Sequence, residues 1–176
     1  MTELRPITLF QTDYRLLSKC LAVRLHSVMS EVVDPGQLGV AAQGKGGGIL
    51  TGLYSMLSLI DYVNSNNLKA YVASFDNMKA YDRASTAYLD KVTEKMGFPP
   101  LFRSWLKMLH KGATTKLILP SGLSREIKVS FSFRQGDCIA GDLYCLTLEP
   151  FLRMLRKKVM GCVSSTSLKT RRGRPR

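Results

Sequence analysis

The chain has 176 residues, of which 45% are hydrophobic and 22% are charged, and its formal net charge is +13. This length suits about one domain, and the composition excludes wholesale disorder. No apolar run reaches the roughly 18 residues that a membrane span needs, and the N-terminus lacks a basic-then-apolar signal pattern, so we expect an intracellular protein, nuclear or cytoplasmic, that is not secreted and contacts no membrane.

The positive charge is concentrated at the C-terminal end of the chain. Nine basic residues and no acidic residue follow Glu149. Such a segment favours a polyanionic partner, and nucleic acid is favoured over a membrane because the segment has no amphipathic apolar face. A solvated, disordered end is the alternative. Residues 161–176 also lack hydrophobic periodicity, so we expect a folded body over residues 1–160 and a basic disordered tail after it.

The first predicted element is a long helix. Apolar residues recur at helical intervals from a cap at Thr12 or Asp13 as far as Val32. The turn sequence Asp34-Pro35-Gly36 ends this helix, and the glycine-rich stretch 36–48 that follows is expected to be a loop.

A second helix and a strand are predicted next. Residues 49–63 again show helical spacing, and a cluster of asparagines closes them. The apolar run from Ala70 to Phe75 then predicts a strand that ends at the carboxylate of Asp76.

Two further helices are predicted in the middle of the chain. Ser85 is a suitable N-cap for a helix that Gly97 ends. The pair Pro99-Pro100 begins another helix, which runs as far as Gly112.

A hairpin and a last helix complete the predicted elements. Residues 116–119 and 127–133 read as two strands joined by turn residues at 120–122. Residues 143–159 return to helical spacing, with Pro150 expected to kink or break the helix. Helices combined with a strand and a hairpin indicate an α+β or a mixed α/β domain.

The segment FDNMKAYDR, residues 75–83, offers a candidate metal site. A carboxylate at the end of a central strand, here Asp76, can bind a divalent ion that bridges phosphate oxygens. Tyr81 would lie on the following turn and face the same cleft, and Asp82 could cap the next helix. The alternative is an ordinary strand-to-helix turn in which Asp76 is only a cap.

The segment FRQGD, residues 133–137, lies between the hairpin and the last helix. Backbone amides at such a junction can hold an anion or the edge of a nucleobase. Gln135 offers both a donor and an acceptor, and Gly136 permits a close approach. A capped turn without a ligand is the alternative.

Several segments together resemble a known enzyme family. The segments are RPITLFQTDYRLLSK (5–19), FDNMKAYDR (75–83), LDKVTEKMGFPPLFRSWLKMLH (89–110), FRQGD (133–137) and LEPFLRMLRK (148–157). In this order they resemble the reverse transcriptase of non-LTR, LINE-type retrotransposons, over about residues 4–158. The specificity of the resemblance lies in the co-occurrence of the segments.

The resemblance implies an α+β fold, namely the fingers and part of the palm of the right-hand polymerase fold, over residues 1–160. It implies nucleotidyl transfer with two Mg²⁺ ions. Asp76 matches the first metal-binding aspartate, and the backbone carbonyl of Asn77 is a further possible ligand. Tyr81 matches the aromatic steric gate that selects deoxynucleotides against ribonucleotides.

The resemblance also implies the remaining contacts to substrates. Gln135 and Gly136 match the loop that packs on the incoming nucleotide and template, and Arg5 and Arg15 fall where the fingers contact the triphosphate. The implied partners are an RNA template, a DNA primer and deoxynucleotides.

The chain departs from the family pattern in three places. The glycine-arginine loop is VAAQGKGGG here, and CIAGD replaces the proline-rich continuation of FRQGD. The family's second catalytic signature, an aromatic-x-Asp-Asp hairpin, is expected beyond Met160, where the chain has no acidic residue. We therefore expect a fragment that does not polymerise alone. The alternatives are a non-catalytic nucleic-acid-binding remnant that uses its basic tail, and a decayed element without function.

The tail contains a short match to a DNA-binding motif. Arg172-Gly173-Arg174-Pro175 resembles the AT-hook core, in which Arg172 and Arg174 would lie in the minor groove of A·T tracts. A four-residue match in a basic segment is common by chance, and a tail unrelated to the family is the favoured interpretation.

Overall fold

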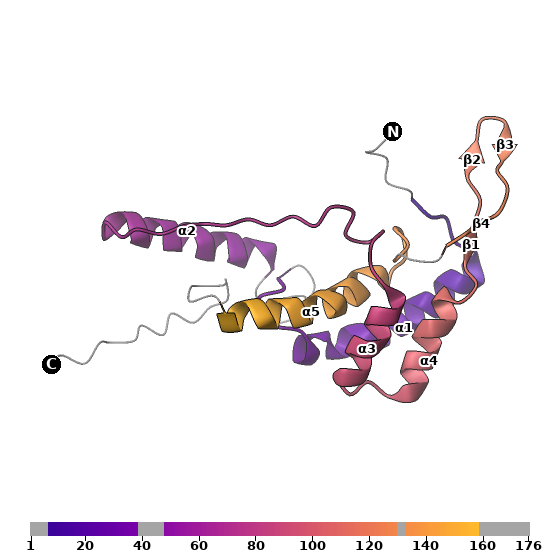
Figure 1. Cartoon of the computed structure of the whole chain (residues 1–176), viewed down its shortest axis with the longest axis horizontal. Coiled ribbons are helices and arrows are strands. Elements are labelled where there is room, and N and C mark those ends of the chain that lie inside the picture. Colours follow the sequence, from indigo (N-terminus) through magenta and orange to yellow (C-terminus); the bar gives the residue numbers. More distant parts are fainter. Residues whose placement is uncertain (1–6, 39–47, 130–132, 159–176) are drawn as a thin grey trace.

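The computed structural model of the chain describes residues 7–38, 48–129 and 133–158. In these ranges the helices are α1 (Thr12–Val32), α2 (Ile49–Ser65), α3 (Thr86–Lys95), α4 (Pro100–His110) and α5 (Ala140–Lys158), and the strands are β1 (Thr114–Thr115), β2 (Ile118–Leu119), β3 (Gly122–Leu123) and β4 (Ile127–Lys128). This mixture, drawn in Figure 1, fits the expected α+β class. The expected tail, residues 161–176, lies outside the described residues.

The core lies where α1, α3, α4 and α5 meet (Figure 1). α5 packs on α1 and α3, and α3 also packs on α4. The most deeply buried apolar side chains are Leu25, Met29, Phe133, Ile139, Leu143 and Leu146. Burial of each apolar side chain of this size contributes about 1.5–3 kcal/mol. These residues therefore hold together segments that are more than a hundred positions apart in the sequence.

The predicted helix boundaries follow local signals. The Ser85 side chain accepts a hydrogen bond from the Tyr88 amide and caps α3. The expectation that Asp82 caps this helix is wrong, because the turn over residues 78–83 ends before the cap position. Gly97 has a φ of 81°, a left-handed conformation that ends α3, and Pro100 occupies the first turn of α4.

The last helix tolerates its proline. α5 runs from Ala140 to Lys158 with Pro150 inside it, so the predicted break is wrong and the helix starts three residues earlier than expected. Proline removes one intrahelical hydrogen bond. The adjacent carboxylate of Glu149, which is fully buried, anchors the helix by accepting bonds from the Asp34 amide at 3.0 Å and the Gln37 side chain at 2.6 Å.

The predicted strand at Ala70–Phe75 does not form. Residues 68–77 are neither helix nor strand, and the Tyr71 and Phe75 side chains are 98% and 84% exposed. A strand is stabilised by hydrogen bonds to a neighbour, and no described strand pairs with this segment. The segment is apolar, as the sequence shows, but the expectation that it is buried and paired in a sheet is wrong.

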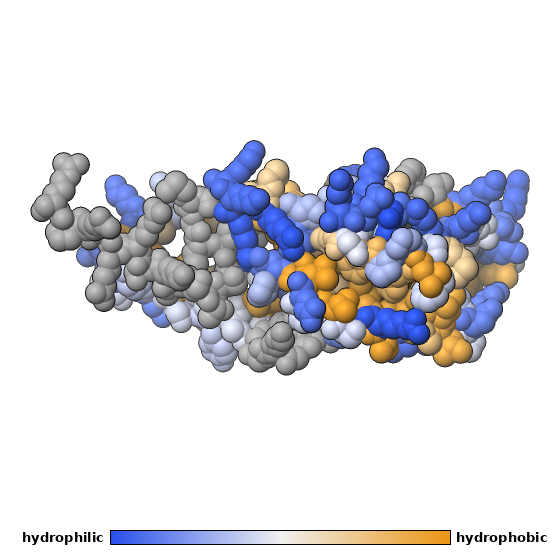
Figure 2. Space-filling model, turned by 90° about the horizontal axis from the view of Figure 1, so that it is seen from below, coloured by the Kyte–Doolittle hydropathy of each residue, from blue (hydrophilic) through white to orange (hydrophobic). Residues whose placement is uncertain are grey.

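Helix α2 lies outside the core, and apolar side chains are exposed elsewhere on the molecule as well. No residue of α2 is buried, so this helix contributes nothing to the core, and Figure 1 shows it beyond the group formed by α1, α3 and α4. Figure 2 shows further hydrophobic side chains at the surface of the half of the molecule that holds α1, α3 and α4. No helix in the described ranges is long and apolar enough to cross a membrane.

The hairpin prediction is confirmed over residues 114–128. β2 pairs with β3 across the two turn residues Pro120 and Ser121, and β1 pairs with β4. Two residues separate β1 from β2, whereas three separate β3 from β4, so the return strand carries one extra residue, as in a β-bulge. Phe133, expected at the end of the hairpin, is instead a buried core residue outside any strand.

Candidate nucleotide and metal site

Asp76 lies in the exposed segment that follows α2 and precedes the turn over residues 78–83. Its carboxylate makes no hydrogen bond or ion pair with any described residue. The side-chain amide of the next residue, Asn77, donates to the Tyr144 hydroxyl of α5 at 2.7 Å. Asn77 therefore holds this segment against α5.

The described residues fit one divalent ion better than two. No group of three or more His, Cys, Asp or Glu side chains in the described ranges could hold a metal ion. Mg²⁺ usually binds only one or two protein carboxylates together with waters and substrate phosphates. The exposed Asp76 carboxylate supplies one such ligand. A clamp of two ions needs more ligands than the Asp76 carboxylate alone.

Tyr81 lies on the turn that follows Asp76 and packs against α5. Its ring centroid is 5.1 Å from that of Tyr144, at an interplanar angle of 35°. Burial, with smaller contributions from Cys145 and Tyr144, raises the pKa of the Tyr81 hydroxyl, so the group is protonated at neutral pH. The Tyr81 ring is thus a fixed, uncharged surface beside the exposed segment.

A main-chain hydrogen bond joins the two motif segments. The Phe133 amide donates to the Tyr81 carbonyl at 3.0 Å, which places FRQGD directly beside FDNMKAYDR. The Phe133 side chain is buried, and its ring lies edge-on to His110 with centroids 5.9 Å apart. The core therefore fixes the register between the segments.

The turn of FRQGD requires its glycine. Gly136 has a φ of 100°, and a Cβ placed on it would lie 3.0 Å from the Thr8 carbonyl oxygen. The Gln135 carbonyl accepts a hydrogen bond from the Thr8 amide at 2.9 Å. The half-buried Gln135 side chain makes no hydrogen bond with a described residue, which leaves its amide available to a ligand.

A side-chain network holds the FRQGD turn to α1. The Tyr14 hydroxyl donates to Asp137 at 2.6 Å and accepts from the Arg134 guanidinium at 2.8 Å, and Ser18 donates to the other Asp137 oxygen. The Arg134 guanidinium lies 4.6 Å from the Tyr14 ring centroid and also donates to the Leu109 carbonyl at 2.6 Å. We call these four residues, Tyr14, Ser18, Arg134 and Asp137, the α1 network.

The electrostatics of the α1 network favour a neutral tyrosine. Burial, the hydrogen bond to Asp137 and the charge of Asp137 all raise the pKa of the Tyr14 hydroxyl, and Arg134 partly opposes them. The hydroxyl therefore remains a donor to Asp137 at neutral pH. Sequence analysis did not identify this network, although Tyr14 and Ser18 are four positions apart and so share one face of a helix.

The predicted site residues fall into three groups. The main-chain bond between Tyr81 and Phe133 joins the segment that holds Asp76, Asn77 and Tyr81 to the segment that holds Gln135 and Gly136. Arg15 is exposed on α1 and forms no ion pair with a described residue. Arg5, Arg172 and Arg174 lie outside the described residues.

Comparisons with known proteins identify the family of the chain. Residues 1–168 match the family described as reverse transcriptase (RNA-dependent DNA polymerase). The chain is 31% identical over 159 residues to the transposon TX1 uncharacterized 149 kDa protein of Xenopus laevis, which covers 90% of this chain and 12% of that protein. It is 26% identical to the retrovirus-related Pol polyprotein from type-2 retrotransposable element R2DM of Drosophila melanogaster, over 89% of this chain and 14% of that protein.

A third relative is the Pol polyprotein from type-1 retrotransposable element R2 of Popillia japonica, 28% identical over 86% of this chain and 21% of that protein. The chain thus spans 12% to 21% of the length of these curated relatives, which are non-LTR retrotransposon proteins. The resemblance inferred from the sequence motifs is confirmed. The chain belongs to the reverse transcriptase family, and it corresponds to a reverse transcriptase domain of non-LTR retrotransposon type.

Proposed function

We propose that the chain forms the fingers and part of the palm of a right-hand polymerase fold, which copies an RNA template into DNA in a longer protein. The observation that carries this proposal is the hydrogen bond between the Phe133 amide and the Tyr81 carbonyl, because it brings an exposed carboxylate segment beside a glycine turn. Such a pair of segments can contact the phosphates and the sugar of one bound nucleotide at the same time.

Each predicted residue takes a separate role in the proposal. Asp76, with the Asn77 carbonyl, would hold Mg²⁺, which when bound neutralises phosphate charge and supports nucleotidyl transfer. The fixed Tyr81 ring would exclude a ribose 2′-hydroxyl, since Tyr144 restricts its movement. Gln135 and Gly136 would contact the nucleotide and the template.

Two arginines complete the proposed nucleotide contacts. Arg15 is exposed on α1, one residue after Tyr14 of the α1 network, and would contact the triphosphate together with Arg5. An arginine guanidinium suits this role because it binds phosphate oxygens in a bidentate manner. The DNA primer would then approach the nucleotide from the side of Asp76.

The chain alone is expected not to polymerise. No group of three or more His, Cys, Asp or Glu side chains in the described ranges could hold a metal ion, and no Asp or Glu follows Glu149 in the sequence. Two Mg²⁺ ions would then be poorly neutralised and poorly positioned. Extension of a DNA primer on an RNA template by the purified 176-residue chain, lost in Asp76→Ala, would contradict this expectation.

Nucleotide binding tests the proposed site without requiring turnover. A fluorescent deoxynucleotide should bind the chain with an anisotropy change that is stronger in the presence of Mg²⁺. Asp76→Asn should remove the Mg²⁺ dependence, whereas Asp61→Asn, an exposed carboxylate on α2, should retain it. Equal Mg²⁺ dependence in all three proteins would refute the proposed role of Asp76.

The alternative function, nucleic-acid binding without chemistry, makes a different prediction. It requires that RNA or DNA binding is salt-sensitive and depends on residues 162–176, with no effect of Asp76→Asn and no Mg²⁺-dependent nucleotide binding. A deletion of residues 162–176 measured beside Asp76→Asn therefore separates the two functions.

A further inference from the structure

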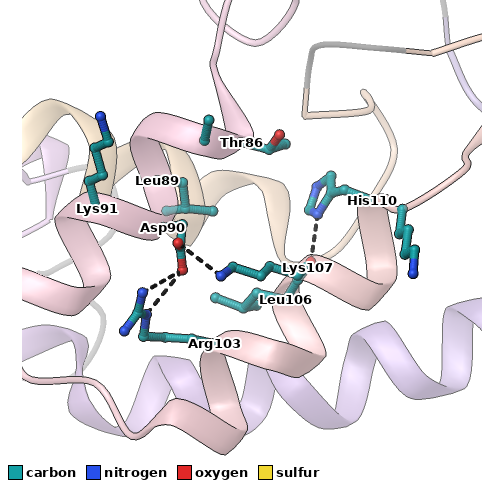
Figure 3. A pocket seen from close by; sticks show the side chains of 10 residues that line it. Thr86, Leu89, Asp90, Lys91, Arg103, Leu106, Lys107 and His110 are labelled. Carbon is teal, nitrogen blue, oxygen red and sulfur yellow. Dashed lines mark hydrogen bonds and ion pairs between the residues drawn. The ribbon is translucent and has the colours of Figure 1, made fainter.

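A basic hollow lies between α3 and α4, outside the proposed nucleotide site. Its volume is about 400 Å³. The lining includes four cationic side chains, those of Lys91, Arg103, Lys107 and Lys111, and one carboxylate, that of Asp90. Figure 3 shows Asp90 between the two helices, with Arg103 and Lys107 of α4 pointing toward it. We call this feature the α3–α4 hollow.

The single carboxylate neutralises only part of this charge. Asp90 accepts from Arg103 at 2.8 Å and lies 2.9 Å from the Lys107 ammonium. The hydrogen bond from Lys107, the largest effect, and those from Arg103 lower the pKa of the Asp90 carboxyl, so Asp90 is ionised at neutral pH. Glu94 lies beyond the lining and approaches Arg103 at 3.3 Å. An excess of positive charge remains even when both carboxylates are counted.

Two lysines carry this excess at the rim of the α3–α4 hollow. Lys91 and Lys111 are exposed and form no ion pair with any described residue. In Figure 3 the Lys91 ammonium points away from Asp90. Burial lowers the pKa of His110, so its ring adds no charge at neutral pH. The rim therefore presents two ammonium groups without an ion-pair partner in the described ranges, one from α3 and one from Lys111, the residue that follows α4.

The floor of the α3–α4 hollow limits the kind of anion that fits. Leu89 and Leu106 lie beneath the charged rim, and the described lining contains no Phe, Tyr or Trp side chain. A nucleobase usually binds on an aromatic platform, which is missing, whereas a sugar–phosphate backbone needs only cations over a tolerant surface. These features favour a nucleic-acid backbone over a free nucleotide.

The α3–α4 hollow also adjoins the FRQGD segment through the core. His110, which lines the hollow, packs edge-on against Phe133, whose amide binds the Tyr81 carbonyl. We propose that the α3–α4 hollow binds the sugar–phosphate backbone of a single-stranded nucleic acid, an inference that rests on the proposed function.

Lysine footprinting of the complete chain tests this inference without a mutation. The chain is acetylated with a lysine-reactive ester, with and without a short single-stranded RNA, and the modified lysines are identified by mass spectrometry. Bound RNA should reduce acetylation of Lys91 and Lys111 several-fold and leave Lys19 and Lys69, which are exposed outside the hollow, unchanged. Equal protection of all four lysines, or none, would overturn the inference.

The salt dependence of RNA binding provides a second, quantitative test. K91Q/K111Q removes two proposed phosphate contacts, so the slope of log affinity against log salt should become shallower by about 1.4. The control K19Q/K69Q removes the same charge elsewhere and should leave the slope unchanged. Equal slopes in the two double variants would refute the α3–α4 hollow as a binding surface.

Two further outcomes separate the sources of failure. If K91Q/K111Q loses binding of a polyglutamate peptide but not of RNA, the surface binds acidic protein and the inference is wrong. If RNA binds with equal slopes while Mg²⁺-dependent nucleotide binding still requires Asp76, only the α3–α4 hollow fails. If Asp76→Asn has no effect while Lys91 and Lys111 are protected, only the proposed nucleotide site fails.

Discussion

Replacement of Tyr14 by phenylalanine isolates the contribution of one hydroxyl to the fold around the FRQGD turn. The substitution keeps the ring, which stacks on Phe10 at 4.8 Å and lies beneath the Arg134 guanidinium. It removes the donor to Asp137 at 2.6 Å and the acceptor of the Arg134 bond at 2.8 Å. The perturbation is therefore confined to two hydrogen bonds that involve charged groups.

The expected loss follows from these two contacts. A hydrogen bond to a charged group contributes about 1.5–3 kcal/mol, but Ser18 still donates to Asp137 and Leu109 still accepts from Arg134. We expect Tyr14→Phe to lower the free energy of unfolding by about 2 kcal/mol, which is roughly a 30-fold change in the folding equilibrium.

Urea titration followed by far-ultraviolet circular dichroism measures this loss. Tyr88→Phe is the matched control, because the Tyr88 hydroxyl on the exposed side of α3 has no hydrogen-bond partner among the described residues. The control should stay within about 0.5 kcal/mol of the parent. A double-mutant cycle with Asp137→Ala should give a coupling energy of at least about 0.5 kcal/mol, since the two residues share a bond.

The pH dependence gives a result that would refute the reasoning. The folded-state pKa of Tyr14 is raised above its unfolded value, so the stability it contributes is complete below about pH 10 and falls as the pH rises through the folded-state pKa. The difference between the parent and Tyr14→Phe should shrink by about 1.4 kcal/mol per pH unit above pH 10. Equal losses in Tyr14→Phe and Tyr88→Phe at neutral pH would show that the α1 network is not stabilising.

Three other substitutions test separate parts of the structure by the same titration. Gly136→Ala should lower the free energy of unfolding by about 2 kcal/mol, because Gly136 has a positive φ and a Cβ there would meet the Thr8 carbonyl. Gly141→Ala in α5, where an added Cβ meets no atom, should instead raise the free energy of unfolding by up to about 1 kcal/mol. Equal effects of the two substitutions would contradict this expectation. Burial raises the pKa of the Asp142 carboxyl, so ionisation of this group destabilises the folded state relative to the unfolded chain. Asp142→Asn should therefore gain stability relative to the parent as the pH rises above about 4, and a constant difference would count against it. Glu149→Ala should lower the free energy of unfolding by about 3 kcal/mol, because three donors lose a buried acceptor. Arg153→Ala, whose side chain is 56% exposed, should lower it by less than about 1 kcal/mol. Similar losses would show that the buried carboxylate does not anchor α5.

The helices could be predicted because their signals are local. The cap at Ser85, the glycine at 97 and the proline at 100 each act within one turn of their position, and the structure uses all three. The apolar stripe of α1 was also readable, although only its residues on the face toward α5 are buried, and Leu16 on the other side is exposed. Periodicity predicts which residues share a face, and packing decides which face is covered.

The missing strand and the α1 network could not be predicted because they depend on residues that are distant in the sequence. The apolar segment that ends at Phe75 has the composition of a strand. A strand forms only with a partner strand, and the sequence of the segment itself does not specify that partner. Tyr14 and Asp137 are 123 positions apart, and nothing in either local sequence indicates that they bond. The candidate site was predicted through family motifs, whereas the contacts that fix its geometry are long-range.

The bond between the Phe133 amide and the Tyr81 carbonyl has a consequence for how such a sequence can change over generations. Both atoms belong to the main chain, so the bond itself excludes only proline at position 133, whereas the buried Phe133 side chain restricts this position to residues that fit the core. Inheritance of this geometry therefore depends on the path of the backbone and on a residue at position 133 that fills the core.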